Sequence, residues 1–132
     1  MNEIGIEIEF FEPEDKFGPI KATVHKSGRI GFSLGANKLI DFEANKLFKI
    51  GRRKDGDNDQ LFMVPVTTKD EMTFEVVRAG AYYSIRAKRL LSQMGIDYRD
   101  LEESIIYYID EVKNDASKYY KLTRKKKRSN NT

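Results

Sequence analysis

The stretch that decides the fold is residues 23–50, TVHKSGRIGFSLGANKLIDFEANKLFKI, because residues 76–98 repeat much of its plan. SLGANKL at residues 33–39 aligns with SIRAKRL at residues 84–90, so that serine, alanine and leucine fall in register. Upstream, VHKSG at 24–28 matches VVRAG at 76–80, and downstream IDF at 40–42 matches IDY at 96–98. Two such copies predict an internal duplication and not a long repeat array.

Both copies predict the same order of strands and helices. Repeat one, residues 20–67, has strand patterns at 20–26, 29–32, 47–53 and 61–66, with a helix at 34–40 that Ser33 caps. Repeat two, residues 73–124, has strand patterns at 73–78, 81–84, 104–112 and 118–123. Its helix is expected at 85–94, after Ser84 and before Gly95, with one more helical turn at 100–104.

Neither copy is long enough to bury a convincing core alone. We therefore expect a single α+β domain over residues 1–124. In this domain two pseudo-symmetric ββαββ repeats, each a hairpin–helix–hairpin unit, close into one small β-barrel without free edges.

The two ends of the chain carry different patterns. Ile4, Ile6, Ile8 and Phe10 alternate with Gly5, Glu7 and Glu9, which predicts an N-terminal strand over residues 3–11 with one apolar face. The last residues, KKKRSNNT at 125–132, have nothing to bury. They predict a disordered basic tail.

Composition narrows the class of protein. The chain has 132 residues and no cysteine, which excludes a disulfide framework and a thiolate metal site. It has no apolar run of the roughly 18 residues that a membrane helix needs, and glutamates stand where a signal peptide carries lysines. We therefore expect a cytoplasmic protein with no membrane contact. The net charge is +3, and without the four cations at residues 125–128 it is 3 − 4 = −1.

Residues 28–42, GRIGFSLGANKLIDF, running on to Ile50, resemble the SpoVT/AbrB (MazE-like) swapped-hairpin family. The resemblance rests on the Gly-Arg turn, the basic helix and the acidic turn before a closing strand, and it covers residues 20–67 and, more loosely, 73–124. Ser33 and Ser84 stand where the family has proline, Asp41 replaces its exit glycine, and Ala81 replaces the second turn arginine. In that family two chains form a barrel that binds DNA, so the resemblance implies a pseudo-dimeric barrel within one chain.

The same resemblance implies a DNA-binding, transcription-regulator-like function and a set of contact residues. Arginine and lysine suit phosphates, and arginine or asparagine can read base edges. The implied contacts from the turns, the helices and the tail are Arg29, Asn37, Lys38, Arg78, Arg86, Lys88, Arg89, Lys125, Lys126, Lys127 and Arg128. The alternative is that these are exposed residues of ordinary amphipathic elements, and that the tail only solubilises the protein or docks a partner.

The aspartates near residue 57, the single histidine and the paired tyrosines belong to residue types that often bind metals or ligands, but their patterns favour structural roles. Asp55, Asp57 and Asp59 have the spacing that opens a calcium loop, but glutamine at position 60 and valine at position 66 break the pattern, which favours a plain turn. His25 is the single histidine and is expected mid-strand in a structural role. Tyrosine doublets at residues 82–83, 107–108 and 119–120 should each point one ring into the core and one outward.

The sequence shows no catalytic motif, so we expect no enzyme activity, no cofactor, no metal and no small-molecule substrate. Duplex DNA is the expected partner. One alternative is a structural or protein-interaction scaffold that binds a protein partner or forms a homo-oligomer. A third function is binding of single-stranded nucleic acid, with the outward tyrosines stacking on bases, although cross-strand packing is the simpler role for these rings.

Overall fold

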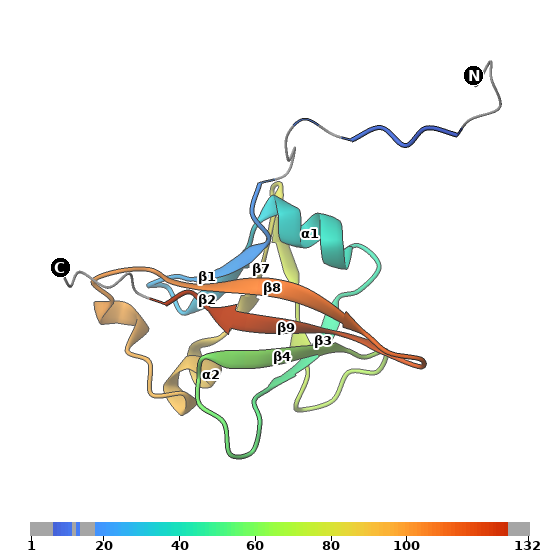
Figure 1. Ribbon diagram of the computed structural model, residues 1–132. Helices are drawn as coiled ribbons and strands as arrows, with labels where there is room; N and C mark the ends of the chain where they lie inside the picture. The colour runs from blue at the N-terminus through green and yellow to red at the C-terminus, as the bar shows by residue number, and fades with distance from the viewer. Residues whose placement is uncertain (1–6, 12, 14–17, 127–132) are drawn as a thin grey trace.

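The computed structural model describes residues 7–11, 13 and 18–126, which form a nearly closed antiparallel barrel of nine strands with few helices (Figure 1). The strands are β1 (Lys21–Val24), β2 (Arg29–Phe32), β3 (Leu47–Gly51), β4 (Gln60–Pro65), β5 (Phe74–Glu75), β6 (Val77–Ala79), β7 (Tyr82–Arg86), β8 (Ile105–Lys113) and β9 (Lys118–Arg124). The helices are α1 (Leu34–Ile40), α2 (Lys88–Gln93) and the 3₁₀ turn η1 (Tyr98–Asp100). The expectation of a small barrel is confirmed.

The sheet order, β5-β3-β4-β9-β8-β1-β2-β7-β6, explains how the barrel nearly closes. Its two outermost strands, β5 and β6, are consecutive in the chain and are separated only by Val76. β5 pairs with β3 and β6 pairs with β7, while the Val76 amide donates a hydrogen bond of 2.8 Å to the Lys46 carbonyl. The single strand expected at 73–78 is therefore wrong in detail, because this interruption lets one segment serve both ends of the sheet.

One hydrophobic core fills the barrel and draws side chains from the whole described chain. At its centre the ring of Phe42 lies 4.8 Å from Phe32, 5.9 Å from Phe48 and 5.4 Å from Tyr83. All four aromatic residues are buried in the same cluster. Because this cluster contains residues from 20–67 and from 73–124, the two segments share their interior.

Helix α1 begins after Ser33, the residue expected to cap it. The Ser33 hydroxyl accepts a hydrogen bond from the Ala36 amide at 3.1 Å and donates one to the Pro19 carbonyl at 2.8 Å. Asp41 ends the helix with a left-handed φ of 63°. The cap therefore also ties the helix to the segment that leads into β1.

The helix expected at 85–94 begins later than expected, and its alignment through Ser84 is wrong. Ser84 lies inside β7 opposite Gly31, and Ile85 pairs with Ile30 with both side chains buried. Strand pairing and burial therefore extend β7 over the residues that the helix was expected to begin with. Ala87 occupies the N-cap position of α2 without a side-chain cap.

Several local expectations also need correction. Residues 7–11 form no strand, since they lack a paired neighbour among the described residues, and residues 3–6 lie outside the described part. The helical turn expected at 100–104 is instead η1 at Tyr98–Asp100. His25 lies just after β1 and is exposed, with its ring over Gly31, where an added Cβ would meet Nε2 at 2.7 Å.

The tyrosine doublets behave as the strand period requires. Tyr83, Tyr107 and Tyr120 are buried, while their neighbours point away from the core. The prediction of one inward and one outward ring in each doublet is confirmed.

Candidate functional site

Arg29, Arg86 and Lys88 come together where the first hairpin turn meets the start of α2. Arg29 and Arg86 are direct partners across β2 and β7, and Arg29 Nη1 donates to the Ser84 hydroxyl at 3.2 Å. The Ala87 amide donates to the Gly28 carbonyl at 2.8 Å, which holds the beginning of α2 against the turn. We name these three cations the turn patch.

Glycine at position 28 lets Lys88 pack closely on the turn. Gly28 has a φ of 85°, and a Cβ built there would lie 2.4 Å from the Lys88 Cγ. The same Cβ would lie 3.1 Å from the Tyr98 ring. The aliphatic part of Lys88 is therefore fixed over Gly28, although the residue as a whole remains exposed.

The turn patch concentrates positive charge without a described counterion. Like charges directly opposite on neighbouring strands repel each other, and the Arg29–Arg86 pair has this arrangement. None of the ion pairs between described side chains includes Arg29, Arg86 or Lys88. An anion bound between these cations would relieve the repulsion.

The remaining barrel residues of the implied DNA-contact set lie elsewhere or serve the fold. Asn37 Oδ1 accepts a hydrogen bond from the Phe42 amide at 3.2 Å, which stabilises the exit of α1. Lys38 is exposed in the last turn of α1, and Arg89 is exposed in α2 next to the turn patch in sequence. Figure 1 shows α1 and α2 on opposite sides of the barrel, so they do not form one continuous surface in that view.

Arg78 is occupied by a polar network around Glu43. Its Nη1 lies 3.1 Å from the Glu43 carboxylate, and its Nε donates to the Gly80 carbonyl at 2.8 Å. The Tyr83 hydroxyl donates to the same carboxylate at 2.8 Å, and this hydrogen bond, followed by burial, raises the pKa of Tyr83. The charge of Arg78 is thus compensated, in contrast to the turn patch.

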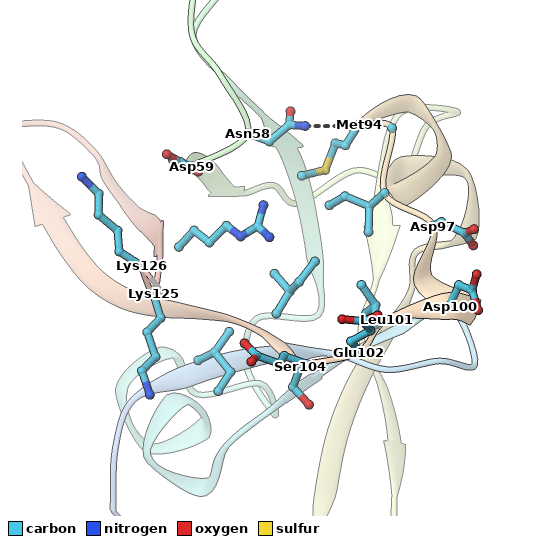
Figure 2. A pocket seen from close by; sticks show the side chains of 16 residues that line it. Asn58, Asp59, Met94, Asp97, Asp100, Leu101, Glu102, Ser104, Lys125 and Lys126 are labelled. Atoms are coloured by element: carbon cyan, nitrogen blue, oxygen red, sulfur yellow. Dashed lines mark hydrogen bonds between the residues drawn. The ribbon is translucent and has the colours of Figure 1, made fainter. Parts of the chain in front are cut away.

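Lys125 and Lys126 line a cleft of about 1090 Å³ beside the end of β9. The Lys125 amide donates to the Ile106 carbonyl at 2.7 Å, so hydrogen bonding continues past the expected tail boundary. Figure 2 shows these lysines on the side of the cleft opposite Asp97 and Asp100. Lys127 and Arg128, like the rest of 127–132, lie outside the described residues.

The cleft mixes both charge signs. Its carboxylates are Asp59, Asp97, Asp100, Glu102 and Glu103, and its cations are Arg124, Lys125 and Lys126. Asn58 fixes one wall of the cleft. Its side-chain amide donates to the Met94 backbone carbonyl, and its backbone carbonyl accepts from the Tyr107 hydroxyl at 2.8 Å. The C-terminal cations therefore have carboxylates near them, which weakens their pull on a distant phosphate.

Strand register brings together side chains on the outside of the barrel that no sequence motif links. Lys21, Lys121 and Phe62 carry no motif, yet pairing places them on one outer sheet face with Tyr108 and Tyr119. Period-two alternation could have assigned each side chain to the outside, but not the strand order that joins them.

Across the described part of the chain, no group of three or more His, Cys, Asp or Glu residues is arranged to hold a metal ion. Asp57 instead accepts a hydrogen bond from the Asp59 amide at 3.0 Å within the turn before β4. Nor do these described residues include a helix long and apolar enough to cross a membrane.

Comparison with known proteins finds no matching family, no matching curated protein and no matching solved structure.

Proposed function

We propose that this chain is a cytoplasmic, non-enzymatic DNA-binding module, similar to a transcription regulator, that holds duplex DNA through the turn patch. The single observation that carries the proposal is the uncompensated Arg29–Arg86 pair with Lys88 packed beside it. Phosphate oxygens are the ligands that such closely spaced cations favour. Exposed Arg89 extends the positive surface along α2.

We further propose that the barrel is a pseudo-dimer of two related hairpin–helix–hairpin halves, as in swapped-hairpin DNA-binding proteins. Support comes from the strand pairing. The hairpin β1–β2 corresponds to β6–β7, and β3–β4 corresponds to β8–β9. The pairs β2–β7 and β4–β9 each join equivalent strands. Strands β5 and β6 together are the equivalent of β1, so the pair β1–β8 corresponds to the pair β5–β3. This correspondence fits a two-fold relation between the halves.

The test is a duplex DNA mobility shift combined with fluorescence anisotropy at several salt concentrations. We expect Arg29→Ala/Lys88→Ala to weaken binding and to reduce the slope of log affinity against log salt by about 0.9 for each phosphate that the variant no longer neutralises. Lys69→Ala/Lys118→Ala is the charge-matched control, because both lysines already pair with carboxylates, Glu75 and Glu111.

Two results would argue against the turn patch. Undiminished binding by Arg29→Ala/Lys88→Ala is one. The other is loss of binding only when residues 125–128 are deleted, which would assign the affinity to the C-terminal cations. A variant that weakens binding must also keep the urea unfolding midpoint of the wild type, so that an unfolded protein is not mistaken for one with a damaged DNA-binding surface.

A scaffold that binds protein is the second candidate, and the N-terminal segment favours it. Phe10 is 85% exposed and Phe11 is 87% exposed, with Ile8 also exposed nearby. Neighbouring large apolar side chains at such exposure are typical of interaction sites. If the segment mediates self-association, Phe10→Ser/Phe11→Ser will lower the molar mass measured by sedimentation. An unchanged monomer mass for wild type and variant would remove the homo-oligomer from consideration.

A further inference from the structure

An outer sheet face on β1, β8, β9 and β4 combines aromatic rings with lysines. Along one row of strand partners Lys21 faces Tyr108, and Tyr108 faces Thr123. Along the next outward row Lys121 lies between Asp110 and Phe62. Alternate residues of these strands, such as Tyr107 and Leu122, are buried, so the named side chains project away from the core. We name this surface the aromatic face.

Two aromatic positions stand on the aromatic face. Tyr108 is 42% exposed. Tyr119, two residues before Lys121 on β9, packs its ring 6.0 Å from that of Phe62 at an interplanar angle of 58°, and both are half-buried. Thr123 is the strand partner of Tyr108, so the rise per residue separates the two positions by about 13 Å along the sheet.

The charge of the aromatic face is positive. Lys21 and Lys121 belong to none of the ion pairs between described side chains. Lys49, on β3 beyond β4, is paired with Asp70 at 3.1 Å and adds no free charge. Asp110 is the one carboxylate in these two rows, so the two lysines leave a net charge of 2 − 1 = +1. Unpaired lysines around exposed rings complement a ligand that has both phosphates and flat apolar groups.

The strands that carry this surface are accessible. In Figure 1, β8, β9 and β4 run side by side and no helix is drawn over them. The turn patch involves β2, β7 and α2, which are different elements. A ligand on the aromatic face would therefore leave the turn patch in place.

We propose that the aromatic face binds single-stranded nucleic acid. Bases stack on Tyr108 and on the Tyr119–Phe62 pair, while phosphates contact Lys21 and Lys121. Duplex DNA does not fit this role, because its bases are stacked within the helix and present only their edges. Unpaired bases offer flat faces, which aromatic side chains on a sheet accept without strong sequence preference.

The experiment is fluorescence anisotropy with a labelled oligodeoxythymidylate and, in a parallel arm, an oligouridylate, both over a series of salt concentrations that begins low. We expect Tyr108→Ala to weaken binding between about five- and a hundredfold, as removal of one stacking ring does elsewhere. Lys121→Ala should reduce the salt slope by about 0.7, the value for one phosphate contact on a single strand. The two arms distinguish DNA from RNA as the source of the strand.

Matched controls separate this proposal from a general loss of charge or aromatic area. Tyr82 is 63% exposed on β7, away from the aromatic face, so Tyr82→Ala should leave the affinity unchanged. Tyr119→Leu keeps an apolar contact with Phe62 and tests the second ring without opening a gap. Arg29→Ala/Lys88→Ala should weaken duplex binding only.

The outcomes are distinct. Weaker single-strand binding in Tyr108→Ala and Lys121→Ala, with unchanged binding in Tyr82→Ala, supports the proposal. Absence of single-strand binding by the wild type in low salt overturns it. Equal weakening by Tyr82→Ala also overturns it, as does loss confined to Arg29→Ala/Lys88→Ala, because the strand would then bind at the turn patch. Duplex binding that fails while single-strand binding survives refutes only the turn-patch function.

Discussion

Replacing Gly28 by alanine tests how closely the first hairpin turn is fitted against α2. The new methyl group would occupy space that Lys88 fills, with the Cβ 2.4 Å from the Lys88 Cγ and 3.1 Å from the ring of Tyr98. It would also hold an L-residue at a φ of 85°. We therefore expect both backbone strain and a displaced lysine.

The magnitude follows from these two contributions. An L-residue in the left-handed region costs about 1–2 kcal/mol. Pushing the Lys88 side chain out of its preferred rotamer adds about 1 kcal/mol. Gly28→Ala should therefore lower the free energy of unfolding by about 2–3 kcal/mol, a large part of the stability of a domain this size. Displacement of Lys88 should also weaken duplex binding beyond the effect on folding.

The assay is urea unfolding, with Gly80→Ala as the control. Gly80 has a φ of 63° in the other hairpin turn, and a Cβ there would meet no atom within 4 Å. Gly80→Ala therefore reports backbone strain alone. Lys88→Ala combined with Gly28→Ala should recover about 1 kcal/mol relative to Gly28→Ala, because the clashing Cγ is gone. Equal destabilisation by Gly28→Ala and Gly80→Ala would refute the close packing of Lys88.

Four further outcomes test the interior and the helix cap. Tyr107→Phe should lower the free energy of unfolding by about 1 kcal/mol, since its hydroxyl donates to the Asn58 carbonyl. Tyr120→Phe should change it little in the same urea assay, since the buried Tyr120 hydroxyl makes no hydrogen bond of normal geometry among the described residues and has only the Lys118 ammonium close by. Ser33→Ala should cost about 1–2 kcal/mol, measured by thermal unfolding, through loss of the α1 cap. Burial raises the pKa values of Tyr107 and Tyr120, so the folded state keeps these protons to higher pH. The stability that these protonated tyrosines contribute is complete below about pH 10 and is lost as the pH rises through their raised pKa values. Urea unfolding midpoints measured across alkaline pH should show this loss, and Tyr107→Phe should make it smaller.

Local patterns located most of the barrel strands and helix α1, but they misplaced the start of α2. The strand pattern at 118–123 is β9 at Lys118–Arg124, because Tyr120 and Leu122 alternate with Lys121 and Thr123 in the sequence and are the residues that the barrel buries. The start of α2 was misplaced because Ile85 and Ala87 suit a helix as well as a strand by composition alone. Cross-strand pairing of Ile85 with Ile30 decides the outcome, and a single sequence does not reveal such a distant partner.

The N-terminal segment shows the opposite limit. Ile8 and Phe10 alternate with glutamates in a clear strand pattern, yet residues 7–11 have no strand partner within the described chain. Alternation of apolar and polar residues indicates that a segment can join a sheet, but it does not indicate whether a partner strand is present.

The candidate site was predictable residue by residue but not as a surface. Arg29, Arg86 and Lys88 were among the contacts that the family resemblance implied, and the pairing of β2 with β7 brings the three together. Arg78 has the same side chain but lies beside Glu43, a residue that is 35 positions away in sequence. Charge compensation of this kind depends on tertiary contacts, so composition does not distinguish Arg78 from Arg86.

The insertion of β8 and β9 between β1 and β4 has a consequence for synthesis on the ribosome. Hairpins β1–β2 and β3–β4 leave the ribosome first. One edge of β1 and one edge of β4 then have no hydrogen-bonding partner until β8 and β9, which are translated last, have been made. A nascent chain that stops before residue 105 lacks the two strands that join β1 to β4, so its barrel stays open. The unpaired edges of β1 and β4 can pair with strands of other chains, so such truncated products should aggregate and become substrates for chaperones and proteases.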